Sequence, residues 1–116
     1  PRATQRYWAA NYLGNLGDKK NIESLKEGLK DESESVIVAS ALAILKIQKN
    51  EQAYEVLMSQ LKSKKPLTRL YASLGFEELM AFGYDQPAGT AHLLKDDYEF
   101  VTRVAKRIVP LTELKK

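Results

Sequence analysis

The chain has 116 residues, of which 44% are hydrophobic and 28% are charged, and its formal net charge is +3. This length suits one ordinary globular domain with its own core. The small positive charge does not by itself call for nucleic acid, because 18 basic residues are spread among 15 acidic ones. The absence of cysteine excludes disulfides, thiolate metal sites and cysteine nucleophiles.

The apolar pattern predicts an all-α chain with helices near residues 3–16, 20–30, 35–48, 50–63, 66–82, 87–95 and 98–114. Turn residues support these boundaries, since Gly17 suits the end of the first helix and Pro66 suits a helix entrance. Gly14 and Gly17 together are predicted to close a helix. A phosphate-binding loop would instead follow a strand and open a helix. The longest mainly apolar run, at about 12 residues, is too short to span a bilayer.

One stripe recurs in four of these helices, at steps of 31, 32 and 32 residues. Each copy places small or apolar residues at positions i, i+1, i+4 and i+7, which share one side of a helix. The four sets are Ala9, Ala10, Leu13 and Leu16; Ser40, Ala41, Ile44 and Ile47; Ala72, Ser73, Phe76 and Leu79; and Val104, Ala105, Ile108 and Leu111. We call the helices that carry this stripe second-type helices.

A second pattern lies between them, because Ile22, Leu25 and Leu29 are matched 32 residues later by Tyr54, Leu57 and Leu61. We call the helices with this pattern first-type helices. Each repeat is therefore a helix pair, and stacked pairs cover each other's apolar faces. The predicted fold is an α-α superhelix, a HEAT-like solenoid of about three and a half helix pairs, which forms a single domain over residues 1–116.

The second-type helices resemble the second helix of HEAT repeats, whose form is V-R-x-x-A-A-x-A-L-x-x-L-G. The match is good from Arg6 to Gly17 and moderate from Arg69 to Leu79, whereas Ile37 stands where the arginine should be in the segment from Val36. The resemblance implies a helical scaffold whose second helices line a partner-binding face.

A narrower resemblance concerns the string R-Y-W-A-A followed by L-x-x-L-G, and the stretch YEFVTRVAKRIV. Both look like the helical repeat region near the C-terminus of certain bacterial sulfatases. This resemblance implies the C-terminal accessory part of a sulfatase-like (arylsulfatase-type) hydrolase, in the periplasm or outside the cell. That family's C/S-x-P-x-R motif and its Asp and Asn calcium ligands do not occur here, so no catalytic residue is carried over.

The chain opens on Pro1 with a second-type helix that is rich in aromatic residues and lacks its first-type partner. The end of a repeat array normally needs a cap with a polar outer face. We therefore expect the chain to be a fragment of a longer protein, in which a preceding module covers this first helix.

No constellation of residues in the sequence suits catalysis, a cofactor or a metal. His92 is the only histidine, and no serine, aspartate or second histidine lies at a useful spacing from it. We interpret it as a structural residue. Lysine clusters such as 62–65 and 115–116 fall at predicted helix ends or turns, where positive charge complements the helix dipole.

A surface is the better candidate site. Beside the stripe, one position precedes its first residue and another lies one turn later. Over the four copies, five of the eight residues at these positions are aromatic or arginine, which are typical interface anchors, and the others are Ala39, Ala43 and Gly75. The predicted binding surface consists of Trp8, Tyr12, Tyr71, Arg103 and Arg107. The alternative for the two residues of the first helix is that they only fill the gap left by a missing helix.

These observations predict a non-catalytic helical-repeat scaffold or interaction domain that uses no cofactor. Its partner would be the preceding module of the parent protein or another protein, and a sulfated glycan could be reached through the parent. The alternatives are a stand-alone protein–protein interaction adaptor and, less favoured, a nucleic-acid-binding HEAT array.

Overall fold

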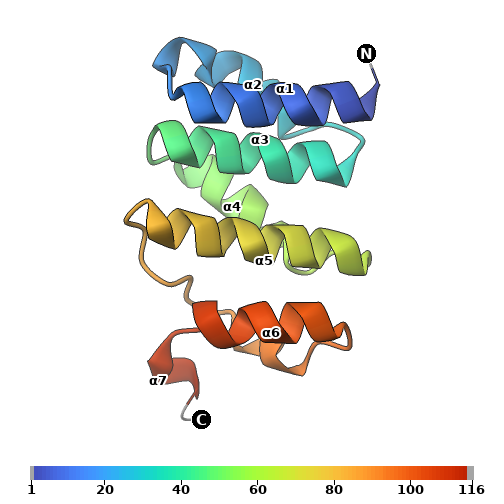
Figure 1. The fold of residues 1–116 in the computed structure, drawn as a ribbon, viewed down its shortest axis with the longest axis vertical. Helices are drawn as coiled ribbons and strands as arrows, with labels where there is room; N and C mark the ends of the chain where they lie inside the picture. The colour runs from blue at the N-terminus through green and yellow to red at the C-terminus, as the bar shows by residue number, and fades with distance from the viewer. Residues whose placement is uncertain (1, 115–116) are drawn as a thin grey trace. The chain divides into compact units, whose positions relative to one another are not determined.

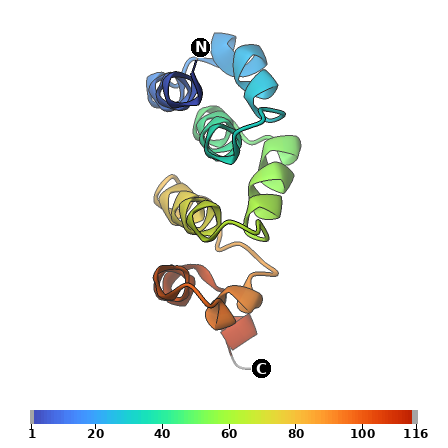
Figure 2. The same cartoon turned by 90° about the vertical axis from the view of Figure 1, so that its right-hand side faces the viewer.

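A computed structural model describes residues 2–114 of the chain (Figures 1 and 2). No strand occurs among these residues, so the predicted all-α fold of helix pairs is confirmed. None of their helices is long and apolar enough to cross a membrane. The helices, with η for a 3-10 helix, are α1 (Ala3–Leu16), η1 (Lys19–Asn21), α2 (Ile22–Gly28), α3 (Glu34–Ile47), α4 (Glu51–Gln60), α5 (Pro66–Ala81), η2 (Ala91–Lys95), α6 (Glu99–Ile108) and α7 (Leu111–Leu114).

The chain divides into two compact units, Pro1–Gln60 and Leu61–Lys116. We call them unit 1 and unit 2. Unit 1 contains α1 to α4, and unit 2 contains α5, η2, α6 and α7. A single domain over the whole chain stays a prediction.

In unit 1 the second-type helices α1 and α3 lie side by side and run in the same direction (Figure 1). The first-type helices α2 and α4 form a second layer against them (Figure 2). The core between the layers contains Leu25 of α2, Ile44 of α3 and Leu57 of α4, all of them buried. This is the layered arrangement that paired helices with one apolar face each require.

The contact between α1 and α3 is very close at Gly14. A Cβ atom added to Gly14 would lie 2.8 Å from both the Cα and the Cβ of Ala43. Such distances are shorter than carbon–carbon contacts in packed interiors, so a glycine is needed here. Gly14 therefore lies inside α1 and does not end it, which corrects the sequence-based prediction. Only Gly17 ends the helix, with φ of 71° and its N–H donating to the carbonyl of Leu13 at 3.3 Å.

In unit 2 the helix α5 packs against α6, and α6 packs against η2. Pro66 occupies the first turn of α5, where its missing N–H has no cost. The core of unit 2 is formed by large buried side chains from all three of these helices, namely Phe76, Leu79, Leu93, Val101 and Ile108.

Two predicted helices of unit 2 are wrong in extent. The segment predicted as a helix over 87–95 is helical only in the short 3-10 helix η2, because Pro87 and Gly89, which has φ of 77°, shape an irregular loop before it. The helix predicted over 98–114 is broken into α6 and α7. Val109 is extended with ψ of 128°, as expected for a residue that precedes a proline, and Pro110 has no N–H to donate.

The short helix α7 is fastened to the loop before η2 by one carboxylate. Glu113 accepts hydrogen bonds from the backbone N–H groups of Gly89, Thr90 and Ala91, at 2.8, 3.0 and 3.1 Å. Three N–H groups that no strand or helix would satisfy are thus paired. The loop is held although it lacks regular structure.

The predicted stripe is buried in most of its positions. Burial holds for Ala10, Ser40, Ala41, Ile44, Ala72, Ser73, Phe76, Leu79, Val104, Ala105 and Ile108. The prediction is wrong for Ala9, Leu16 and Leu111, which are exposed. Leu111 has left the stripe because α6 ends three residues before it. Leu16 is the last residue of α1, and Ala9 lines an open groove between α1 and α2.

Candidate interaction surface

An exposed apolar face runs along α1. Trp8, Tyr12 and Leu16 are four residues apart, so they form one row on the helix, and their exposed fractions are 63%, 64% and 54%. The ring of Trp8 packs edge-on against Tyr7 at 5.1 Å between centroids, with an angle of 80° between the planes. We call Trp8, Tyr12 and Leu16 the α1 face.

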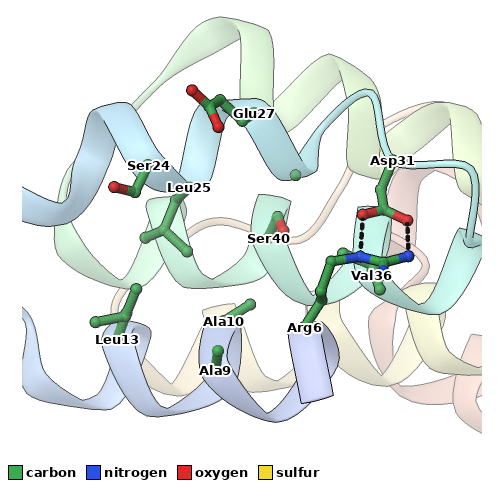
Figure 3. Close-up of a pocket in the computed structure, with 11 residues that line it drawn as sticks. Arg6, Ala9, Ala10, Leu13, Ser24, Leu25, Glu27, Asp31, Val36 and Ser40 are labelled. Atoms are coloured by element: carbon green, nitrogen blue, oxygen red, sulfur yellow. Dashed lines mark hydrogen bonds and ion pairs between the residues drawn. The ribbon is translucent and has the colours of Figure 1, made fainter. Parts of the chain in front are cut away.

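A groove of about 400 Å³ lies between α1 and α2 (Figure 3). Ala10 and Leu13 of α1 and Leu25 of α2 contribute apolar walls, and Ser40 of α3 lies at its base. Gly28 is part of the same lining. A Cβ on Gly28 would lie 1.9 Å from the Oγ of Ser40, so the absence of a side chain allows α2 to approach α3 here.

One end of this groove is closed by an ion pair between α1 and the loop before α3 (Figure 3). The Nε and Nη2 of Arg6 donate to the two carboxylate oxygens of Asp31 at 2.7 and 3.0 Å. Oδ1 of Asp31 also accepts the backbone N–H of Ser33 at 2.9 Å, which fixes the turn that leads into α3. The hydrogen bonds from Arg6 and then from Ser33 lower the pKa of Asp31 below its ordinary value.

Unit 2 contains an equivalent ion pair, between Arg69 and Asp96. Arg69 of α5 donates from Nε and Nη2 to the carboxylate of Asp96 at 2.8 and 3.0 Å, and Oδ1 of Asp96 accepts the N–H of Tyr98 at 2.9 Å. Burial opposes the ionisation of Asp96, but the hydrogen bonds from Arg69 and Tyr98 outweigh it and lower the pKa. Both pairs join a second-type helix to the turn that precedes the next one.

The predicted site residues of unit 2 lie on α5 and α6. Tyr71 is 44% exposed on α5. Arg107 forms a two-pronged ion pair with Glu77 of α5, in which Nη2 and Oε1 are 3.1 Å apart. The hydrogen bond from Arg107 lowers the pKa of Glu77 despite partial burial of that carboxyl. Arg107 is therefore held against α5 by a defined partner.

Arg103 lies one turn before Arg107 on the same helix. Its Nη2 donates to Oε1 of Glu99 at 2.5 Å, and its guanidinium lies 5.5 Å from the centre of the Phe100 ring. The Nη1 of Arg107 donates to the backbone carbonyl of Arg103 at 3.2 Å. The two arginines are thus adjacent on one exposed side of α6.

The five predicted residues divide between the units. Trp8 and Tyr12 share one face of α1 in unit 1, whereas Tyr71, Arg103 and Arg107 belong to unit 2. One continuous surface of all five stays a prediction. Sequence reasoning missed Leu16 as a member of the exposed face, although its spacing of four residues from Tyr12 was the available signal.

The other sequence candidates have no site around them in the described part of the chain. His92 is exposed on η2, and no group of three or more His, Asp or Glu side chains that could hold a metal occurs among residues 2–114. Lys62, Lys64 and Lys65 lie in and beside the turn before α5, as predicted. The pair 115–116 lies outside the described residues.

Comparison with known families agrees with this architecture. Residues 1–75 match the HEAT-repeat family, so the chain belongs to the HEAT-repeat proteins. HEAT repeats typically form helical scaffolds that mediate protein interactions. No curated protein and no solved structure matches the chain.

Proposed function

We propose that this chain is a non-catalytic HEAT-repeat scaffold that binds a protein partner through the α1 face. The observation that carries the proposal is the row of Trp8, Tyr12 and Leu16, each more than half exposed, on a helix whose other side is packed against α3. Large contiguous apolar surface that is rimmed by polar residues is typical of interaction sites.

The composition of the α1 face supports a protein partner. Trp and Tyr supply large contact areas at a small cost in side-chain entropy and dominate the energetics of many interfaces. The sequence of α1, ATQRYWAANYLGNL, contains no acidic residue, so no carboxylate has to be desolvated when the face is covered.

The exposed residues of unit 2 support a second, more polar contact. Tyr71 is an aromatic anchor, and the ion pair with Glu77 orders the side chain of Arg107 before any partner arrives. An ordered arginine loses less conformational entropy on binding than a mobile one.

Affinity capture from an extract of the source cells tests this function. Proteins retained by the wild-type chain are compared with those retained by the Trp8→Ser/Tyr12→Ser double variant and by a control at an exposed apolar residue outside the predicted surface, Leu67→Ser. The proposal expects a partner whose yield falls at least tenfold with the double variant. A partner lost equally with Leu67→Ser, or retained by all three chains, contradicts a dominant role for the α1 face.

Attachment to a sulfatase-type enzyme is the finer form of this proposal, and its support is the resemblance of R-Y-W-A-A and YEFVTRVAKRIV to such regions. The coding sequence upstream of Pro1 decides it. A C/S-x-P-x-R motif there supports the accessory role, and helical repeats alone support a stand-alone adaptor.

A further inference from the structure

One position of the repeat contacts the preceding second-type helix in both units. Ala43 of α3 has the repeat position that Tyr12 has in α1, and Ala43 contacts Gly14 of the preceding second-type helix. In unit 2 the equivalent position is Arg107 of α6, which contacts Glu77 of α5. Glu77 follows Gly14 by 63 residues and occupies the same position of its own repeat. Tyr12 thus occupies the repeat position through which a second-type helix contacts the preceding second-type helix.

In α1 this position is uncovered. At about 100° per residue, Trp8 and Tyr12 lie about 160° and 200° around the helix from Ala10, which is buried on the side of α1 where Gly14 meets α3. The α1 face therefore points away from α3. The corresponding side of α3, which carries Ala43, is covered by α1.

We propose that the α1 face docks a second-type helix of a partner protein, parallel to α1, with two small residues four positions apart opposite Trp8 and Tyr12. This inference rests on the proposed function and names the partner's chemistry. The orientation follows from α1 and α3, which run in the same direction where they meet (Figure 1). Continuity with that interface indicates a helix in the same register.

The small residues follow from the volume at the contact. Gly14 and Ala43 together leave no room for one added Cβ atom. Where Tyr12 replaces the alanine of this pair, glycine or alanine on the partner helix leaves the most space for the ring at a helix spacing close to that of α1 and α3, because overpacked contacts are destabilising. Gly14 and Ala10 of α1 are a pair of this kind.

A second copy of this chain does not offer the required surface. Its own pair, Ala10 and Gly14, is buried between α1 and α3. Exposing the pair would open the contact that unit 1 is built on.

The test uses the full chain and a synthetic peptide of residues 2–17, in which Trp8, Tyr12 and Leu16 are each replaced by lysine. This peptide keeps the Ala10 and Gly14 pair and contains no tryptophan. The chain has a single tryptophan, so the emission of Trp8 reports on the α1 face alone. We expect a blue shift on titration of the peptide.

The matched control is the same peptide with Gly14→Phe, which should bind at least tenfold more weakly. The loss would come from bulk and not from helicity, since phenylalanine favours helix more than glycine does. In the protein, Tyr12→Lys should weaken binding of the first peptide at least tenfold. Leu67→Lys, at an exposed apolar residue of α5 outside the predicted binding surface, should leave it within twofold. An unchanged melting temperature shows that the variants are folded.

Two results overturn the inference and leave the proposed function standing, provided that capture of a partner still depends on Trp8 and Tyr12. One is equal binding, or no binding, of the two peptides. The other is a dimer in sedimentation experiments in which Trp8 emission is already blue-shifted and which Tyr12→Lys dissociates, because a second copy would then be the occupant. Loss of both capture and peptide binding overturns both proposals.

Discussion

In unit 1 two second-type helices meet at Gly14 and Ala43, and in unit 2 the same two repeat positions hold Glu77 and Arg107. The first contact brings the backbones so close that no side chain fits at Gly14. In the second contact, two long side chains form an ion pair between the helices. The repeat therefore fixes where consecutive helices touch, while the residues at that position decide whether they touch by close packing or by charge.

A second pair of contacts is the same in both units. Arg6 with Asp31 and Arg69 with Asp96 have matching donor atoms and nearly equal distances. They differ in exposure, because the side chains of Arg69 and Asp96 are 14% and 8% exposed, against 30% and 12% in unit 1. Equal geometry thus coexists with unequal burial, and burial decides what the loss of a partner costs.

The largest expected effect is on the contact between second-type helices, and it tests whether this contact differs between the two units. Gly14→Leu forces α1 and α3 apart, and we expect it to lower the free energy of unfolding by about 3 kcal/mol. Glu77→Leu at the equivalent position should cost below about 1 kcal/mol, because an exposed ion pair contributes little. Urea denaturation followed by circular dichroism measures both. Equal losses would contradict the distinction between packing and charge.

The next effect ranks the contributions of the two arginine–aspartate ion pairs to stability. Asp96→Ala removes the acceptor of the Nε of Arg69 and of the N–H of Tyr98, at a cost of about 2 kcal/mol, while Arg69 keeps its hydrogen bonds to the carbonyl of Ser63 and the carboxylate of Asp97. Asp31→Ala should cost less, because water reaches Arg6 more easily. Thermal unfolding of the two variants gives the order, and a larger loss for Asp31→Ala would show that the exposed fractions do not rank these pairs.

Acid should destabilise both units by protonating the carboxyl groups of their ion pairs. The pKa values of Asp31, Glu77 and Asp96 are lowered in the folded chain, mainly by hydrogen bonds from arginines working against burial. In the unfolded chain such groups bind protons near pH 4, so at pH 3 to 4 the unfolded state binds more protons than the folded one. Their stabilisation is present above about pH 4 and is lost as the pH falls through the lowered pKa values.

Melting temperatures between pH 6 and pH 3 measure this loss. The Asp31→Asn/Asp96→Asn double variant starts lower at pH 6, and its melting temperature should fall less steeply towards pH 3 than that of the wild type. Parallel curves for the two proteins would show that other carboxyls cause the acid sensitivity.

The smallest effect concerns the α1 face. Tyr12→Ser removes a ring that is 64% exposed and should change the free energy of unfolding by less than about 0.5 kcal/mol. The same change at a covered helix contact would cost several times more. A large loss of stability for Tyr12→Ser would mean that the ring supports unit 1 itself, which would favour a structural explanation of the aromatic face.

Most of the fold could be predicted because a helix repeats its apolar side every 3.6 residues, and the positions of Ala41, Ile44, Ala72 and Phe76 follow that period directly. The exposure of Leu16 had a single signal, its spacing of four residues from Tyr12. Its pattern is otherwise that of a core residue, and the absence of a neighbouring helix leaves it uncovered. The break at Pro110 had a local signal in the proline itself. The contacts of Glu113 had none, because its partners are backbone groups more than twenty residues away.

The candidate site was partly predictable for the same reason. Trp8 and Tyr12 are found by spacing along one helix, whereas the ion pairs of Arg107 with Glu77 and of Arg6 with Asp31 depend on which helices become neighbours. Charge at a repeat position therefore indicates that an ion pair could form, and only the three-dimensional arrangement identifies its partner.

The two arginine–aspartate pairs join residues that are 25 and 27 apart in the chain. Interactions of such short span close small loops, which are entropically inexpensive and form early. During synthesis, only about thirty further residues have to be added after the arginine of each pair before its aspartate is present. Folding can then proceed from the amino-terminal end towards the other as the polypeptide is made, without waiting for translation to finish.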